Sequence, residues 1–272
     1  LILKEFKMSK AIRTAIVNTK GGSTKSTSTV NIAAAAAEAG KRVLLVDFDR
    51  QGTSTSMSRV WHREDINVEE HSSWQIFQGK RPSDLAITTE FGYDIIPASG
   101  NLLHAEDLIR DTTFGDGLLA KAFGLDHALN DNYDLIICDT EGAASRLVRA
   151  VLIMCGEYVI PNYPSEGSVE QLDVVTSVVQ GINDNLPFGL EPIRLRAHFF
   201  GRSKPNERIF QIQNDAVKEF FGDFHLSGFE IPETTKFEQA AYGRCPILEF
   251  EPTGKAADAY RNLVKRLFPE LF

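Results

Sequence analysis

Continuous apolar runs alternate with stretches of helical period along most of the chain. A run that is apolar at every position is typical of a buried parallel strand, whereas apolar residues three and four apart predict a helix. These runs predict strands over residues 12–17, 42–48, 93–97, 133–139, 157–161, 193–200 and 226–231. Since helices are predicted between most of them, we expect an α/β fold with a doubly wound, mostly parallel sheet flanked by helices.

The predicted helices lie between these strands and after the last one. They span residues 28–39, 53–62, 72–77, 101–110, 117–129, 146–154, 168–182 and 256–268, and a further helix contains Arg208. Five consecutive alanines favour the first helix, and Gly40 is expected to end it. Asn101 is the expected N-cap of the helix that runs to about Arg110.

Length and composition are compatible with one large α/β domain, because 43% of the 272 residues are hydrophobic. We expect residues 11–272 to form this domain and residues 1–10 to be a leader or vector-derived segment. No apolar run reaches the roughly 20 residues that a membrane span needs. The three cysteines have no metal-ligand spacing, which favours a reducing, cytoplasmic compartment.

The formal net charge of −8 argues against a protein that coats nucleic acid constitutively. The charge is uneven, since residues 194–272 contain 12 Lys and Arg against 11 Asp and Glu. The acidic excess therefore lies in the first 193 residues. This balance is compatible with a weakly basic face in the C-terminal half, and equally with an ordinary solvated surface.

The stretch from Asn18 to Thr27 reads Asn-Thr-Lys-Gly-Gly-Ser-Thr-Lys-Ser-Thr and joins the first predicted strand to the first helix. This layout is typical of a phosphate-binding loop, or P-loop. Glycines let successive N–H groups point at one anion, and the helix adds its positive N-terminal end. Lys25 would contact the β- and γ-phosphates of a nucleotide, and Ser26 would ligate Mg²⁺.

Carboxylates lie at the ends of two other predicted strands. Asp47 and Asp49 are two residues apart, so they point the same way, toward the edge of the sheet where ligands bind. A pair of solvated turn carboxylates is the alternative. Asp139 ends an apolar strand in the Walker B pattern, in which an aspartate fixes Mg²⁺ directly or through a water.

The loop resembles the deviant Walker A motif, Lys-Gly-Gly-x-Gly-Lys-[Ser/Thr], of the ParA/MinD family of ATPases. The resemblance extends from about Ile12 to Leu267, with the other motifs in the family's order. It implies a P-loop NTPase fold and an ATP-bound homodimer in which Lys20 reaches the partner's nucleotide. It also implies a nucleotide-binding set: Gly21, Gly22, Ser23, Thr24, Lys25, Ser26, Thr27 and, near the adenine, Pro232.

The same resemblance assigns roles to the carboxylates. Lys20, Lys25 and Asp49 would be the catalytic residues, with Asp49 positioning the attacking water. Ser26, Asp139 and Asp47 would form the metal site, although Asp47 could instead support its own loop. One residue departs from the motif: Thr24 stands where the family has glycine. We expect Thr24 to need a negative φ, and a degraded loop that binds nucleotide poorly is the alternative.

The implied function is partition of DNA by a cytoplasmic, nucleoid-associated ATPase that uses ATP, ADP and Mg²⁺. The dimer would bind DNA nonspecifically, through salt-sensitive backbone contacts, until a ParB-like or other adaptor protein stimulates its weak hydrolysis. The candidate DNA-binding residues, chosen by charge and loop position, are Arg202, Lys204, Arg208 and Lys236. Glu233 stands where the family's arginine is usual.

Three other functions remain open. A MinD-like ATPase would dock on a membrane through its C-terminal helix, although Pro269 ends that helix early and packing on the sheet is favoured. A nucleotide-binding scaffold without hydrolysis is motivated by Thr24. A ParA-like protein that positions protein cargo would have the same motifs, so the sequence does not separate it from a partition ATPase.

Overall fold

The structure is a computed structural model that describes residues 11–19, 22, 24–142, 145–186 and 191–272. Within these residues one seven-stranded sheet has the strand order β3-β4-β2-β5-β1-β6-β7. All neighbouring strands are parallel except β3 and β4. The strands are β1 (Ile12–Asn18), β2 (Val43–Asp47), β3 (Ile87–Thr88), β4 (Asp94–Ile96), β5 (Leu135–Gly142), β6 (Glu157–Asn162) and β7 (Arg194–Phe200).

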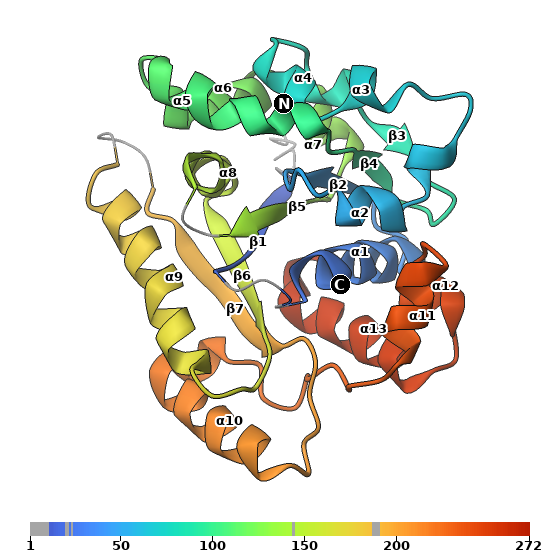
Figure 1. Ribbon diagram of the computed structural model, residues 1–272, viewed down its shortest axis with the longest axis vertical. Helices are drawn as coiled ribbons and strands as arrows, with labels where there is room; N and C mark the ends of the chain where they lie inside the picture. The colour runs from blue at the N-terminus through green and yellow to red at the C-terminus, as the bar shows by residue number, and fades with distance from the viewer. Residues whose placement is uncertain (1–10, 20–21, 23, 143–144, 187–190) are drawn as a thin grey trace, which may run out of the picture.

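Helices cover both faces of the sheet, as the sequence predicts (Figure 1). One face is covered by α1 (Lys25–Glu38), α12 (Ile247–Phe250) and α13 (Lys255–Leu267). The other is covered by α5 (Ala105–Asp111), α6 (Leu118–Leu125), α8 (Arg146–Cys155) and α9 (Ser168–Asn183). The remaining helices are α2 (Thr53–Met57), α3 (Val68–His71), α4 (Trp74–Phe77), α7 (Ala128–Asn132), α10 (Arg208–Phe221) and α11 (Lys236–Tyr242).

Side chains along each buried strand point alternately to the two faces of the sheet, so each face has its own hydrophobic core. In β2, Leu44 and Val46 pack in the core that contains α8, whereas Leu45 packs in the core that contains α1 and α13. Successive strand residues point to opposite faces, so an apolar run of this kind is buried on both sides. This arrangement confirms the predicted doubly wound fold.

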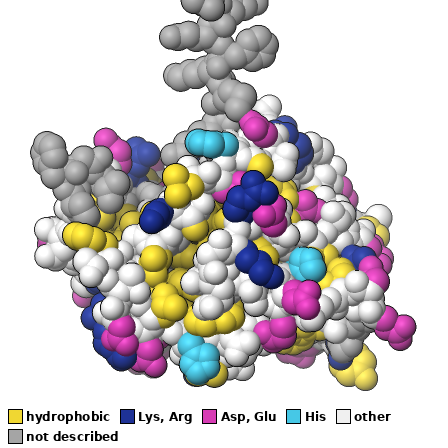
Figure 2. Space-filling view, turned by 90° about the horizontal axis from the view of Figure 1, so that it is seen from above, with side chains coloured by type: hydrophobic (Ala, Val, Ile, Leu, Met, Phe, Trp, Pro, Cys, Tyr) yellow, Lys and Arg dark blue, Asp and Glu magenta, His cyan; other side chains and the backbone are white. Residues whose placement is uncertain are grey.

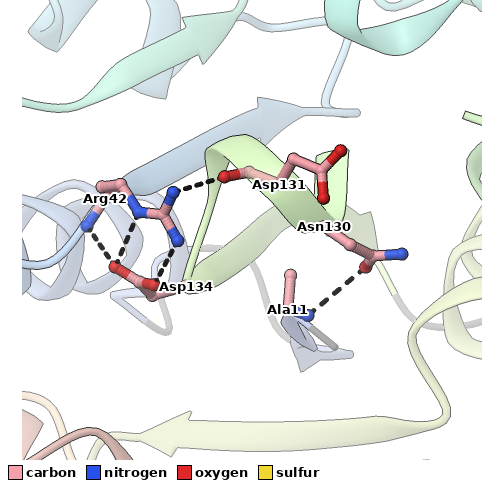
Figure 3. Close-up of polar contacts among 5 residues, drawn as sticks. All are labelled: Ala11, Arg42, Asn130, Asp131 and Asp134. Carbon is pink, nitrogen blue, oxygen red and sulfur yellow. Dashed lines mark hydrogen bonds and ion pairs between the residues drawn. The ribbon is translucent and has the colours of Figure 1, made fainter. Parts of the chain in front are cut away.

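The starts of the central strands are joined by polar contacts at the amino edge of the sheet (Figure 3). Arg42 donates from its backbone N–H and from two guanidinium nitrogens to the Asp134 carboxylate at 2.7–3.2 Å, and also to the Asp131 carbonyl. Ala11 donates to Asn130 Oδ1 at 3.3 Å. These contacts fix where β1, β2 and β5 begin, and therefore which residues reach the opposite, carboxyl edge.

The C-terminal helix packs on the sheet, as the sequence favours. Leu263, Val264 and Leu267 of α13 are fully or almost fully buried against the core that contains α1. Across the described residues, every helix is too short or too polar to cross a membrane.

Several predicted boundaries are wrong. Residues 226–231 do not form a strand, because a turn at Gly228, with φ of 89°, interrupts them. Isolated bridges flank the segment, and they pair His225 with His198 and Pro232 with Ser203. The helix predicted over 53–62 stops at Met57, and Arg59 adopts a φ of 56°. The helix predicted over 117–129 breaks at Asp126, whose carboxylate accepts hydrogen bonds from Ser83.

Asn101 is not a helix N-cap. Its backbone N–H donates to the Ser99 hydroxyl at 3.2 Å, which caps a 3₁₀ turn over Gly100–His104. The α-helix α5 starts only at Ala105. A serine side chain two residues earlier in the chain therefore takes the capping role that the sequence assigned to the asparagine.

A buried histidine pair joins β7 to the segment after α10. His198 Nδ1 lies 3.0 Å from His225 Nδ1, and His225 Nε2 lies 2.9 Å from Asn214 Oδ1. The His198 ring packs against Phe200 and Phe221. Burial lowers the pKa of both histidines below the ordinary 6.5, and the neighbouring imidazole lowers that of His198 further.

This pair predicts that stability falls in mild acid. Above about pH 7 the imidazoles are neutral in both the folded and unfolded states, so they add no pH dependence. Below about 6.5 the unfolded chain takes up protons that the fold excludes, which lowers the unfolding free energy by up to about 1.4 kcal/mol per pH unit for each imidazole. Urea unfolding at pH 6.5 and 5.5 should show a flatter pH dependence for His198→Gln than for wild type. Equal slopes would contradict this interpretation.

Candidate nucleotide-binding site

The loop after β1 leads into a helix N-terminus that is open to an anion. α1 begins at Lys25, its N-cap Thr24 makes no side-chain capping bond, and no acidic residue lies in its first turn. The first N–H groups of a helix have no partner within the helix, and the helix dipole favours negative charge there. The predicted residues Lys20, Gly21 and Ser23 lie outside the described residues.

A cavity of about 400 Å³ opens at this helix end. Three parts of the chain line it: the loop after β1, the loop after β2, and a pair of segments from the C-terminal half. The lining residues are Gly22, Thr24, Lys25, Ser26, Thr27, Asp49, Gln51, Thr53, Gly201, Arg202, Thr234, Phe237, Glu238 and Ala241. The predicted phosphate-binding residues that the structure describes therefore share one cavity with Asp49.

Lys25 is partly buried and lies within the electrostatic influence of three carboxylates. Burial lowers the pKa of its ammonium group, while Asp139, Asp49 and Glu141 oppose that shift. A partly buried cation at a helix N-terminus is suited to an anion that brings several negative oxygens. The phosphate chain of a nucleotide fits this requirement.

Asp139 lies within β5, next to Ser26, and is fully buried. It accepts a hydrogen bond from the Ser26 side chain and one from Ser54 Oγ at 2.7 Å. Burial is the main cause that raises its pKa to about 6, and the Asp49 charge adds to it. The contact with Ser26 places the predicted Walker B carboxylate next to the predicted metal-ligating hydroxyl.

Asp47 is the register partner of Asp139 on the neighbouring strand, and it supports its own loop. Its Oδ2 accepts from the Thr55 backbone N–H at 2.8 Å and from Thr55 Oγ1 at 2.7 Å, while its Oδ1 accepts from the Asp49 N–H at 3.0 Å. Burial, followed by the Asp139 charge, raises the pKa of Asp47. Of its two predicted roles, these contacts favour loop support over metal binding.

The donor set fits Mg²⁺ only together with a nucleotide. No group of three or more His, Cys, Asp or Glu side chains among the described residues is arranged to hold a metal ion. Mg²⁺ usually keeps several waters and binds through one or two carboxylates plus the phosphates of its substrate. The Ser26 hydroxyl and the Asp139 carboxylate behind it match that chemistry.

Thr24 contradicts the expectation of a negative φ. Its φ is 66° and its ψ is 12°, in the left-handed region that favours glycine. Its side chain fits because Gly201 faces it: a β-carbon at position 201 would overlap Thr24 Oγ1 and approach Ser28 Oγ to 3.3 Å. Ser28 Oγ lies in turn 3.2 Å from the Tyr260 hydroxyl. The sequence gives no sign that positions 24 and 201 meet.

The far end of the cavity is lined by residues from the C-terminal half. Pro232 lines a separate hollow beside α13, whereas Thr234, Phe237, Glu238 and Ala241 line the cavity of the P-loop. α11 brings three of these residues to the loop, and Phe237 packs edge-on against Tyr260 of α13. Sequence reasoning missed them, because only tertiary packing brings α11 to the loop.

Three of the four candidate DNA-binding residues lie within ion-pair distance of acidic side chains. Arg202 and Lys204 contact Glu233 at 2.7 and 3.7 Å, and Lys236 lies 4.0 Å from Glu251. Arg208 begins α10 and is exposed. On the end of the molecule formed by α4, α5 and α6, basic side chains likewise lie next to acidic ones (Figure 2).

A parallel sheet with this loop, a helix N-terminus and a buried aspartate at its carboxyl edge defines the class of P-loop nucleotide-binding proteins. The family profile AAA_31, described as an AAA domain, matches residues 10–191. The chain belongs to this family and, within it, to the ParA/MinD group of P-loop ATPases related to partition ATPases.

Named relatives extend over nearly the whole chain. The sporulation initiation inhibitor protein Soj of Bacillus subtilis is 30% identical over 93% of this chain and 96% of its own length. The chromosome-partitioning ATPase Soj of Thermus thermophilus is 29% identical over 95% and 96%. A Borrelia burgdorferi protein provisionally assigned to plasmid partition, solved with AMPPNP bound, has a TM-score of 0.79 at 22% identity, covering 97% of this chain and 100% of that chain. That structural likeness establishes the fold alone.

Because Thr24 and Gly201 face each other, we expect the effect of a substitution at one position on stability to depend on the residue at the other. Gly201→Ala should lower the unfolding free energy by about 1–3 kcal/mol, because the added methyl group overlaps the threonine hydroxyl. Thr24→Gly should be neutral or stabilising by about 1 kcal/mol, because it relieves the left-handed backbone. In the double variant most of the cost of Gly201→Ala should disappear, because only the 3.3 Å approach to Ser28 Oγ remains. Urea unfolding of the four proteins measures the coupling, and additive effects would contradict it.

Proposed function

We propose that this protein is an ATP-dependent partition ATPase. The observation that carries the proposal is one cavity in which Lys25 and Ser26 at a helix N-terminus meet Asp49, with Asp139 bonded to Ser26 behind them. The two Soj relatives, one of them named a chromosome-partitioning ATPase, support the choice of partition. Its site of action would be the cytoplasm, on the nucleoid.

In the proposed reaction ATP and water give ADP and phosphate at a weak intrinsic rate. The N–H groups at the start of α1 and the Lys25 ammonium would hold the phosphates and neutralise charge that develops on them. Bound Mg²⁺ would supply further positive charge to the phosphate oxygens, held by Ser26 with Asp139 behind it. Asp49 would orient the attacking water, since its carboxylate lies in the same cavity.

Asp47 would keep Asp49 in place. Its Oδ1 accepts from the Asp49 N–H, and its Oδ2 fixes the first turn of α2 through Thr55. A carboxylate that is held by three hydrogen bonds in a buried position can set the geometry of the loop to which it belongs. We therefore assign Asp47 a positioning role and Asp49 the catalytic one.

The proposed cycle uses a homodimer. ATP would join two subunits, with Lys20 of each reaching the nucleotide of the other, and the joined pair would bind DNA without reading its sequence. Hydrolysis, stimulated by a ParB-like or other adaptor protein, would release the DNA. The buried apolar side of α13 supports packing of this helix on the sheet and weighs against the membrane-docking alternative.

Substitution of Asp49 should affect ATP hydrolysis, whereas substitution of Asp47 should affect the stability of the fold. Asp49→Ala should abolish phosphate release, by at least about 100-fold, while a fluorescent ATP analogue still binds. Asp47→Ala should lower the unfolding free energy by about 3 kcal/mol or more, because three donors lose their acceptor in a buried place. Asp49→Ala serves as the control for the loss of one carboxylate from this loop. Undiminished turnover in Asp49→Ala would rule out the catalytic assignment, and an absence of turnover in wild type would favour the scaffold alternative.

The DNA-binding step is tested with random-sequence duplex DNA in the presence of ATP, of ADP and of no nucleotide. We expect binding with ATP only, weaker at higher salt, and lost in Lys20→Ala. Fluorescence anisotropy at two salt concentrations measures it. Absence of DNA binding in every nucleotide state would overturn the partition proposal, and binding to anionic vesicles would then favour the membrane-docking alternative.

A further inference from the structure

Three charged side chains meet where the loop after β7 passes the segment after Ile231. Arg202 Nη2 lies 2.7 Å from one oxygen of Glu233, and Lys204 Nζ lies 3.7 Å from the other. Lys204 Nζ also lies 3.2 Å from Glu207. Two of the four candidate DNA-binding cations therefore share one carboxylate.

The backbone holds this carboxylate in place. The Glu233 N–H donates to the Ser203 carbonyl at 2.8 Å, and Ser203 Oγ donates to the Ile231 carbonyl at 3.2 Å. Ser203 is buried and pairs with Pro232 in an isolated parallel bridge. The Glu233 side chain is only 18% exposed, whereas those of Arg202 and Lys204 are about half exposed. The acid is thus fixed and the two cations are the parts that can move.

Arg202 has contacts besides Glu233. Arg202 lies over the Tyr163 ring, 5.8 Å from its centroid, and together with Gly201 it lines the nucleotide cavity. The Arg202 guanidinium lowers the pKa of Glu233, so the acid carries its charge at neutral pH. Ion pairs with exposed cations are weak and are screened by salt. A polyanion can therefore compete with Glu233 for them.

We propose that Glu233 is a latch that withholds Arg202 and Lys204 from DNA phosphates and so limits the DNA affinity of this protein. The inference rests on the proposed DNA binding, and it adds a regulatory contact at the start of the C-terminal half. While the latch is closed, the two cations are neutralised and contribute no phosphate contacts. When it is open, both are available on a loop that also borders the nucleotide.

The salt dependence of DNA binding tests directly whether Glu233 withholds these cations from DNA. Each cation that newly contacts a phosphate makes the plot of log K against log salt steeper by about 0.9. Glu233→Gln keeps the shape of the side chain and removes its charge. In this variant, with ATP present, the slope should steepen by about 1.8, with about 0.9 from each of the two released cations.

Two further variants make the test specific. Glu64→Gln removes one negative charge from an exposed residue that forms no ion pair within the described part of the chain, so its slope should equal that of wild type. Lys204→Ala should leave the slope unchanged when Glu233 is present. The same substitution should reduce the slope by about 0.9 in the Glu233→Gln background.

The possible outcomes distinguish a failure of the proposed role of Glu233 from a failure of the proposed DNA binding. If wild type and Glu233→Gln bind DNA with the same slope, the latch is wrong and DNA binding stands. If Lys204→Ala flattens the wild-type slope, the lysine already contacts DNA and the latch is again wrong. If no variant binds DNA with ATP, the proposed DNA binding itself fails. A steeper slope in Glu233→Gln, reduced by about 0.9 when Lys204→Ala is added, supports the latch.

Discussion

Two buried carboxylates stand side by side at the carboxyl edge of the sheet, and the candidate site depends on how they are held. Asp47 on β2 and Asp139 on β5 are register partners, so their like charges are close in a place without solvent. Such a pair is tolerated only where donors and cations surround it. Thr55 and Ser54 of α2, Ser26 of α1 and the Lys25 charge provide that environment. The P-loop helix and the β2 loop are thereby brought to one cavity.

Most of the sheet, and the loop and helix start that form one end of the candidate site, could be predicted from the sequence, because both are local properties. A buried parallel strand needs an apolar run, and a P-loop needs its glycines, lysine and serine in order. Residues whose positions depend on distant contacts could not be predicted. Gly201 makes room for Thr24, α11 brings Phe237 to the cavity, and a turn at Gly228 replaces the strand expected over 226–231.

The departures of this chain from its family's motifs are compensated by residues far away in the sequence. The left-handed Thr24 is accommodated by the absent side chain at position 201. The acid at position 233 is neutralised by two cations of the β7–α10 loop. Both compensations involve residues 201–204, which follow β7, and Gly201 and Arg202 line the cavity at the start of α1. This short loop therefore contacts both positions at which the sequence departs from the resembled motifs.

A calorimetric titration with ATP tests the nucleotide site most directly. It would be carried out in Mg²⁺ and in EDTA, on wild type and on Ser26→Ala. We predict one ATP per chain, bound more tightly in Mg²⁺, with the Mg²⁺ effect lost in Ser26→Ala because Ser26 with Asp139 behind it holds the ion. Absence of ATP binding, or binding that is the same with and without Mg²⁺ in wild type, would contradict a nucleotide site built on these residues.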